Sequence, residues 1–455
     1  FDDENGSLQI RGGTGLFTGT PPYVWISNQA GNNGVLFGDL NVRAVKDKND
    51  NIISDGRPSL GFTGNMDTYK PAEGSATRSD IAITDPDFKY PSLWKSNIAA
   101  DYKFGDGWVA TVELLYSKDI NAIYHDNIGL YRTEQFVNDG GAGNARPYYN
   151  GYYSDREGNQ KAANHVVMLR NTSKGHSLYT TFQLQKNFVD GILKGLYLNG
   201  SYSFGQSRGV TDGTSSVATS AWKYRAALDG NAEEVGYTAG SFDGRLLLSA
   251  SYTANWSKYA ATSFGLIYQR YRPFRYSYCY NGDANGDSQF SNDLMYIPAN
   301  FDEVKDHLLP GDFDSQEDAW KAMNAFIEQD PYLSKHRGEY AERNGAVAPF
   351  ANQLDLSVSH DIKIYQKNGR SHTLRFSFNI ANFLNLLNRN WGVVQTTVLG
   401  NQQYQFLTIP KGQGPSAANN YTLKYTMAKD LDETFKDNLN DVSRWQMQFG
   451  IKYIF

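Results

Sequence analysis

The residues best suited to direct chemistry lie in one short acidic segment. Asp283, Asn285 and Asp287 occupy alternate positions, with a glycine between the last two, and Gln289 and Asp293 follow. Hard oxygen ligands at positions 1, 3 and 5 of a loop are the arrangement with which many proteins bind calcium. The segment therefore predicts a calcium site formed by the side chains of Asp283, Asn285, Asp287 and Asp293 and the backbone carbonyl of Gln289.

The match to the calcium-binding loop of an EF-hand is incomplete. Ser288 stands at the sixth position, where such loops have glycine, and Leu294 stands at the twelfth, one residue after Asp293. Asp, Asn and Ser side chains also accept hydrogen bonds from nearby backbone N–H groups in ordinary turns. A turn held by its own side chains, without a metal, is therefore the alternative interpretation of the same residues.

No pattern of catalytic residues accompanies this segment in the sequence. The seven histidines include no pair at the HExxH spacing of zinc proteases, and GxxxxGK[ST] does not occur. The Gly13-Thr14-Gly15 run lacks the third glycine of a dinucleotide-binding fingerprint. We therefore expect that the protein is not an enzyme.

The composition excludes several classes of protein. Aromatic residues make up 14% of the 455 residues and charged residues 20%. No stretch approaches the ~18 uninterrupted apolar residues that a membrane-spanning helix needs. The formal net charge of -5, without a basic stripe, gives no reason to expect nucleic acid as a partner. The single cysteine, Cys279, excludes a disulfide within the chain.

Segments of strict alternation between apolar and polar side chains recur along the chain. In the last of them, Phe449 and Ile451 alternate with Gln448 and Gly450. A period of two indicates β-strands with one apolar and one polar face. We expect twelve strands, at residues 8–17, 93–104, 108–118, 177–188, 194–205, 244–256, 262–274, 352–365, 371–384, 395–409, 419–428 and 443–455.

The connections between the expected strands alternate between short and long. The short ones are centred on residues 105–107, 189–191, 257–261, 366–370 and 410–418, and all fall at one end of the strands. A soluble β-sandwich or propeller is the alternative, but it does not separate loop lengths over five successive hairpins. The alternation of apolar and polar residues, together with short connections at one end and long ones at the other, predicts an all-β fold. The fold we expect is an antiparallel transmembrane β-barrel of the bacterial outer membrane. The aromatic C-terminal residue, Phe455, agrees with this prediction.

Four separate motifs resemble one family of outer-membrane proteins. They are residues 11–19 (RGGTGLFTG) with 22–29 (PYVWISNQ), 282–287 (GDANGD) with 292–298 (NDLMYIP), 336–345 (HRGEYAERNG), and 379–382 (NIAN) with 388–392 (NRNWG). In this order, the motifs resemble the Oar-like TonB-dependent outer-membrane transporters, relatives of the SusC group. The resemblance extends from residue 11 to the C-terminus.

The resemblance implies a barrel of about 22 strands closed by an N-terminal plug. Residues 1–455 would then be the C-terminal part of the barrel. The plug, the TonB box, about ten further strands and any signal peptide would lie outside this sequence, which begins with Phe1.

The resemblance also implies a function: active import of a large solute, a peptide or protein fragment or a glycan, driven through the TonB complex. The implied partners are the missing plug and barrel half, outer-membrane lipid and, less directly, a surface lipoprotein lid of the SusD kind. A surface adhesin or structural barrel without import is the alternative function.

The longest expected loop, residues 275–351, would be extracellular and would carry both the acidic segment and a helix. Residues 315–329 predict this helix, with Ser315 as its N-terminal cap and Pro331 as its stop. Its apolar face would consist of Ala319, Met323, Phe326 and Ile327. We expect the residues that follow to clamp the helix to the barrel, with a role for the arginines in binding a substrate carboxylate as the alternative: Arg337, Tyr340, Glu342 and Arg343.

Two further groups of side chains have a structural and a functional interpretation. Five tyrosines predict an interfacial girdle and a strand extension, with a sugar or peptide platform as the alternative: Tyr268, Tyr271, Tyr276, Tyr278 and Tyr280. Four polar residues on the inner faces of strands predict a hydrated wall, with substrate or plug contact as the alternative: Glu113, Asp355, Arg375 and Asn379.

Overall fold

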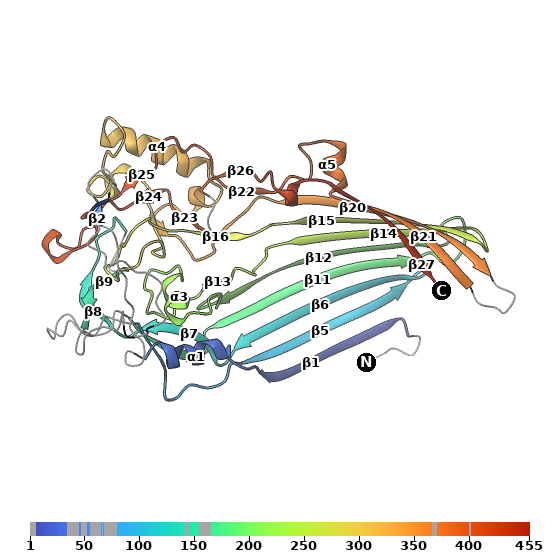
Figure 1. The fold of residues 1–455 in the computed structure, drawn as a ribbon, viewed down its shortest axis with the longest axis horizontal. Helices are drawn as coiled ribbons and strands as arrows, with labels where there is room; N and C mark the ends of the chain where they lie inside the picture. The colour runs from blue at the N-terminus through green and yellow to red at the C-terminus, as the bar shows by residue number, and fades with distance from the viewer. Residues whose placement is uncertain are drawn as a thin grey trace.

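The computed structural model describes residues 6–33, 45–46, 52–54, 65, 67, 80–141, 145–153, 165–365, 371–399 and 402–455. The fold is mostly β, with 48% strand and 12% helix, and its main sheet is antiparallel. Figure 1 shows long strands lying side by side, with the helices and short strands gathered toward one end of them. Within the described ranges, no helix is long and apolar enough to cross a membrane.

Ten long strands follow one another across the main sheet, and a short strand, β13 (Gly236–Tyr237), pairs with the end of one of them. Each is hydrogen-bonded to the next along the chain. In order they are β1 (Leu8–Thr18), β5 (Ser92–Phe104), β6 (Trp108–Asp119), β11 (Gly175–Asn187), β12 (Leu196–Gly209), β14 (Arg245–Ser257), β15 (Ala260–Tyr271), β20 (Ala351–Tyr365), β21 (Ser371–Ala381) and β27 (Gln446–Ile454).

The sheet is open among the described strands. β1 pairs only with β5, and β27 pairs only with β21, so each leaves one edge without a partner strand in this part of the chain. Both edges are long, with eleven residues in β1 and nine in β27. Unpaired strand edges of this length present rows of free N–H and C=O groups and favour pairing with a further strand.

Ten of the twelve expected strands are confirmed, and the expected strands at 395–409 and 419–428 are wrong. These two segments fold back over the loop end of the sheet. Their apolar residues Phe406 and Leu407 are adjacent in sequence and both fully buried, which a strand with one buried face does not allow. Packing among the loops therefore overrides the alternation in these segments, and residues 410–418 are no turn of the main sheet.

The two faces of the main sheet differ in chemistry. On one face, the strand register aligns Ile98 with Leu114 and Phe378 with Phe449. Ile98 and Phe449 are 56% and 67% exposed, so this apolar face is not covered by another layer of the described chain. Polar and small side chains, such as those of Gln183 and Asn199, occupy the opposite face. The predicted alternation between an apolar and a polar face is seen across the sheet, with exceptions such as Leu115 and Ile267 on the polar face.

The connections are short at one end of the sheet and long at the other, as predicted. The hairpins β5–β6, β11–β12 and β14–β15 close with short turns at one end. Long connections follow β1, β6, β12, β15 and β21 at the other end. The expected turn at 366–370 lies outside the described residues.

Short strands and helices form a compact loop assembly at the long-loop end (Figure 1). The strands outside the main sheet are β2 (Val45–Lys46), β3 (Ile52–Ser54), β4 (Ile81–Thr84), β7 (Ala122–Asn127), β8 (Leu130–Phe136), β9 (Pro147–Tyr152), β10 (Val166–Thr172), β16 (Arg275–Tyr278), β17 (Tyr296–Ile297), β18 (Glu339–Tyr340), β19 (Ala346–Val347), β22 (Gln395–Thr397), β23 (Gln403–Tyr404), β24 (Leu407–Thr408), β25 (Thr426–Met427) and β26 (Phe435–Asp437). The helices are α1 (Tyr23–Gly31), α3 (Ala218–Lys223), α4 (Gln316–Gln329) and α5 (Phe383–Leu387), with single 3-10 turns at Phe301–Glu303, Leu333–Lys335, Ala417–Asn419 and Asp441–Ser443.

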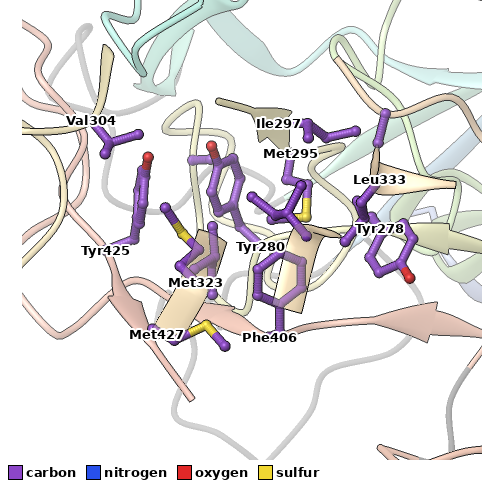
Figure 2. Close-up of a cluster of buried hydrophobic side chains, with 14 of the residues drawn as sticks. Tyr278, Tyr280, Met295, Ile297, Val304, Met323, Leu333, Phe406, Tyr425 and Met427 are labelled. Carbon is purple, nitrogen blue, oxygen red and sulfur yellow. The ribbon is translucent and has the colours of Figure 1, made fainter. Parts of the chain in front are cut away.

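The largest hydrophobic core of the described chain lies in this loop assembly (Figure 2). Residues from the connections 272–350 and 382–445 pack together there, including Met323, Phe406 and Tyr425. Tyr276, Tyr278 and Tyr280 belong to the same core and are at most 1% exposed, so the prediction of an interfacial girdle is wrong for these three tyrosines.

Helix α4 forms as its sequence predicts. Ser315 is the N-terminal cap, and its hydroxyl oxygen accepts a hydrogen bond from the backbone N–H of Asp318. The expected apolar face, which comprises Ala319, Met323, Phe326 and Ile327, is buried in the core. The local cap and the 3.6-residue period are therefore sufficient to define this element.

Candidate functional site

The acidic segment forms a tight turn between β16 and β17. Both carboxylate oxygens of Asp283 accept hydrogen bonds from backbone N–H groups: Oδ1 from Asn285 at 3.1 Å and from Gly286 at 2.6 Å, and Oδ2 from Ser288 at 2.8 Å. Gly286, at φ +84°, approaches the carbonyl oxygen of Tyr149 so closely that a Cβ there would lie 2.1 Å from it. The turn therefore requires both the Asp and the Gly.

Asp287 and Asn285 continue the same pattern. The Oδ1 atom of Asn285 accepts from the Asp287 N–H at 2.9 Å, and Oδ1 of Asp287 accepts from the Gln289 N–H at 2.8 Å. The side-chain amide of Gln289 instead contacts Nε2 of His165 at 3.1 Å. The segment is therefore a turn held by side-chain to backbone hydrogen bonds, a geometry that both interpretations of the sequence share.

Asp293 lies at the centre of a buried ion network. Its Oδ2 atom accepts from the Ala284 N–H at 2.8 Å, and its Oδ1 atom lies 3.2 Å from Nη1 of Arg146. The Nε atom of Arg146 donates to Asp139 at 2.9 Å, and the side chains of all three ionic residues are at most 1% exposed. One guanidinium therefore balances two fully buried carboxylates and holds the connection 120–174 against the acidic segment.

The electrostatics of this region favour an additional positive charge. Burial raises the pKa of Asp293 to about 7 despite Arg146, and burial together with the charges of Asp293 and Asp283 raises the pKa of Asp287 well above its usual value. Burial also raises the pKa of Asp283. Buried carboxylates are stable when they are paired or bind a cation. The oxygen chemistry therefore suits calcium.

The positions of the carboxylates do not by themselves complete a calcium site. Among the described residues, no three His, Cys, Asp or Glu side chains converge as a metal-binding group. Each of four side chains already accepts a hydrogen bond from a backbone N–H of the segment: Asp283, Asn285, Asp287 and Asp293. Calcium binding by the predicted ligands therefore stays a prediction.

The four residues after the α4 region hold three different parts of the loop assembly. Arg337 donates to Oδ1 of Asn324 at 2.8 Å, which ties it to α4 as expected. The hydroxyl of Tyr340 donates to Asp139 at 2.6 Å. Glu342 pairs with Arg208, and Arg343 donates to the carbonyls of Gly209 and Val210 at the end of β12.

Two cavities lie beyond the loop end of the polar sheet face. One, of about 450 Å³, is lined by residues of β5, β6, β11 and β12, among them Asp119 and His176. The other, of about 520 Å³, includes Arg225 and Arg343 in its wall. Thr211 lines both cavities, so they are neighbours at the end of the polar face. The sequence does not indicate that Arg225 and Arg343 line the same cavity, because 118 positions separate them.

The four polar residues that were expected to line a barrel wall make polar contacts along the polar face of the sheet. Arg375 forms two hydrogen bonds to Asp361, at 2.6 and 2.8 Å. The Asn379 amide oxygen accepts from Ser357, the Asp355 carboxylate accepts from the Asn382 N–H, and Glu113 lies 3.7 Å from Arg11. These contacts agree with a polar wall whose charges are mutually satisfied.

No protein-family model matches the chain, and no curated protein matches it.

Proposed function

We propose that the chain forms part of the wall of a transmembrane β-barrel in the bacterial outer membrane, within a TonB-dependent transporter that imports a large solute. The observation that carries the proposal is the continuous apolar face of the ten-stranded sheet, which no described layer covers. An exposed apolar surface of this extent is typical of an interaction site, not of a water-facing surface. Lipid is the partner that suits a face with polar side chains on its opposite side and short turns at one end.

The open edges support a wall that other strands complete. In lipid, each unpaired backbone group costs several kcal/mol, so neither β1 nor β27 is stable with a free edge. Strands outside this sequence would therefore pair with both edges, in agreement with the barrel half and the plug that the family resemblance implies. On this proposal, the loop assembly lies on the extracellular side and captures the solute.

The loop assembly also supports import over the alternative function, a surface adhesin or structural barrel. Its two cavities lie at the end of the polar sheet face, where a solute bound by the loops would enter the barrel. An adhesin needs an exposed binding surface but no cavities on this side. The position of the cavities therefore favours import of a peptide, a protein fragment or a glycan.

The experiment on function uses cells that carry the full-length protein. An epitope inserted at Asp312, in a long connection, should be reached by antibody on intact cells, whereas one at Asp106, in a short turn, should need permeabilised cells; both residues are exposed. Uptake of fluorescent oligopeptides or oligosaccharides should require both the protein and TonB. Binding without internalisation, unchanged when TonB is lost, would instead identify an adhesin.

We also propose that calcium binds the acidic segment through Asp283, Asn285, Asp287, Gln289 and Asp293. A cation would offset the buried negative charge that a single arginine leaves unbalanced. At a calcium concentration of about 100 times the Kd, the free energy of unfolding should rise by about 2.7 kcal/mol relative to the protein in chelator.

The control for calcium binding is Asp287→Asn. This variant should lose the calcium effect, yet in chelator it should be more stable than the wild type, because it removes a buried charge. A wild-type urea midpoint that does not change with calcium would leave the metal-free turn as the correct interpretation.

A further inference from the structure

A polar cavity of about 520 Å³ opens where β12 ends in the loop assembly. Segments that are far apart in the sequence form its wall, at residues 211–226, 277, 290–291, 343–344 and 402–405. Cavities that bind small ligands range from about 300 to 1,000 Å³. The cavity is therefore large enough for a ligand, and the chemistry of its wall determines which kind.

Two buried arginines, Arg225 and Arg343, are the only positively charged residues in the described part of this wall. Arg225 and Arg343 are 5% and 4% exposed. Both donate to the carbonyl of Val210, Arg225 also donates to Gly230, and Arg343 also donates to Gly209. The Nε atom of each has no hydrogen-bond partner. Backbone carbonyls thus position both guanidinium groups without neutralising them.

The carboxylates nearest to these arginines serve other partners. The two oxygens of Asp212 accept from the Ala239 N–H at 2.7 Å and from the side chain of Asn344 at 3.0 Å. Glu234 accepts from the Leu228 N–H at 2.9 Å. Among the described residues, neither Arg225 nor Arg343 forms an ion pair.

The two guanidinium groups also repel each other. Burial, followed by the charge of Arg343, lowers the pKa of Arg225 to about 10, and burial lowers the pKa of Arg343. Both remain cationic at neutral pH. A buried cation without a paired anion is unfavourable, so an anion in the adjacent cavity would be stabilised by both charges.

The rest of the wall suits a ligand that carries several hydrogen-bonding groups. Hydroxyl and amide side chains line it, including Ser220, Ser277, Gln403 and Gln405. Tyr224, which also lines the cavity, is 59% exposed and presents an aromatic ring to solvent. The wall thus combines two cations and one carboxylate, Asp212, with neutral donors and acceptors, which distinguishes it from a site for a free inorganic ion.

We propose that this cavity binds a carboxylate group of the captured solute, with Arg343 and Arg225 as the cationic partners. Arginine suits this role because its planar guanidinium donates several hydrogen bonds to carboxylate oxygens. The inference rests on the proposed transport function and deepens it. Two sources supply the same chemistry: the C-terminus of a peptide and a uronic acid residue of a glycan.

The test measures equilibrium binding to the purified full-length protein by isothermal titration calorimetry. The probes are N-acetyl-trialanine as the free acid and as the C-terminal amide, and glucuronic acid with glucose as its neutral match. We expect at least one acid to bind with a Kd below about 1 mM, and its neutral counterpart to bind at least about tenfold more weakly, a difference of about 1.4 kcal/mol. The acid that binds more tightly identifies the source of the carboxylate.

The variants separate a binding role from a structural one. Arg343→Gln should weaken acid binding by at least about tenfold without changing the affinity for the neutral probe, and Arg343→Lys should recover part of the loss. Arg337→Gln is the matched control: it lies in the same motif but contacts α4 and does not line the cavity, so it should leave binding unchanged. If Arg343→Gln does not fold, Ser220→Phe, which fills the cavity, should abolish acid binding.

Three results would overturn the proposal. They are equal affinity for acid and neutral probes, no measurable binding of either acid, and unchanged acid binding by the Ser220→Phe protein. Binding to purified protein needs neither lipid nor TonB, so its outcome is independent of the uptake experiment. Carboxylate binding without uptake would retain this site and reject transport, whereas uptake without carboxylate binding would do the reverse.

Discussion

At the scale of single residues, buried charge determines how the loop assembly is held together. Arg146 is fully buried between Asp139 and Asp293, and its guanidinium also lies within 5.7 Å of the ring centres of Tyr280 and Tyr340. These partners come from two different connections of the chain, 120–174 and 272–350. One side chain therefore joins segments that have no strand pairing in the main sheet.

Replacing Arg146 by methionine should destabilise the protein strongly. The substitution keeps much of the side-chain volume but leaves Asp139 and Asp293 buried without their cation, and breaking a buried ion pair in this way costs about 3–5 kcal/mol. Lys305→Met is the control, since Lys305 and Asp302 form an exposed pair, and such pairs contribute about 0–1 kcal/mol. Urea unfolding followed by tryptophan fluorescence measures both. Equal, small effects would show that the Arg146 network is not a stabilising centre.

His125 should make stability depend on pH. Burial, and to a smaller extent the charge of Arg225, lowers its pKa to about 4, its Nε2 atom has no hydrogen-bond partner, and the Trp25 ring lies 4.9 Å away. The unfolded chain takes up a proton near pH 6.5 and the folded chain does not. The contribution of the neutral His125 side chain to the free energy of unfolding is therefore fully present above pH 6.5 and is lost as the pH falls toward 4.

The loss for His125 should reach at most about 3 kcal/mol. Buried acids such as Asp126, whose pKa burial raises, act in the opposite direction, so the measurement is the difference between the wild type and His125→Gln. The difference in urea midpoint should grow as the pH falls from 6.5 to 4.5. A difference that does not vary with pH would contradict a neutral buried histidine.

At the scale of elements, the sequence predicts what a local pattern determines. Helix α4 carries its own cap and stop, and the ten long strands carry their own alternation, so both follow from the sequence alone. Residues 395–409 and 419–428 also contain apolar residues, but they pair with each other through β24 and β25 and pack against the connection 272–350. A local stretch of sequence shows neither contact. Tyr278 illustrates the same limit: its burial depends on Asp330, Tyr332 and Phe406, which are all distant in sequence.

The candidate site was predictable to a similar degree. The Asp-x-Asn-x-Asp pattern predicts the turn at 283–293 correctly as a local structure. The cation that faces it, Arg146, and one arginine of the cavity, Arg225, come from other loops, and nothing in their own sequence neighbourhood marks them. Arg343 lies in the same long connection as the acidic segment, and its motif indicated a carboxylate-binding role as an alternative. Sites assembled from several loops depend on the tertiary fold, which a local sequence pattern does not reveal.

The terminal strand β27 should be essential for assembly rather than for transport. It pairs with β21 through nine residues, and Phe455, which is 91% exposed, follows it. On the proposed function, replacing Phe455 by aspartate would place a charge beside a strand that inserts into lipid and closes the wall. The heat-modifiable form should therefore disappear from the outer-membrane fraction. Leu439→Asp, at an exposed residue of a long connection, should assemble normally; normal assembly of both variants would refute this role.

At the scale of the whole molecule, the account predicts that β1 and β27 each have a neighbour outside this sequence. In a background with Cys279→Ser, the pair Ile10→Cys and Ile451→Cys should form no disulfide on oxidation in the full-length protein. The positive control is Ile98→Cys with Leu114→Cys, which are directly opposite across β5 and β6. An efficient cross-link between β1 and β27 would mean that these ten strands close on themselves, which would favour a pore or an adhesin over a plugged transporter.

The central claim is that the apolar face of the sheet contacts lipid, and β11 tests it most directly. Phe182 and Gln183 are neighbours in the middle of this strand and belong to opposite faces. A nitroxide label at each position, in the Cys279→Ser protein reconstituted in vesicles, reports its collisions with lipid-soluble oxygen and with a water-soluble nickel complex. We predict that oxygen reaches the label at 182 and nickel reaches the label at 183, with the same alternation along the strand. Equal access of the nickel complex to both labels would contradict the claim and would make this sheet part of a water-soluble protein.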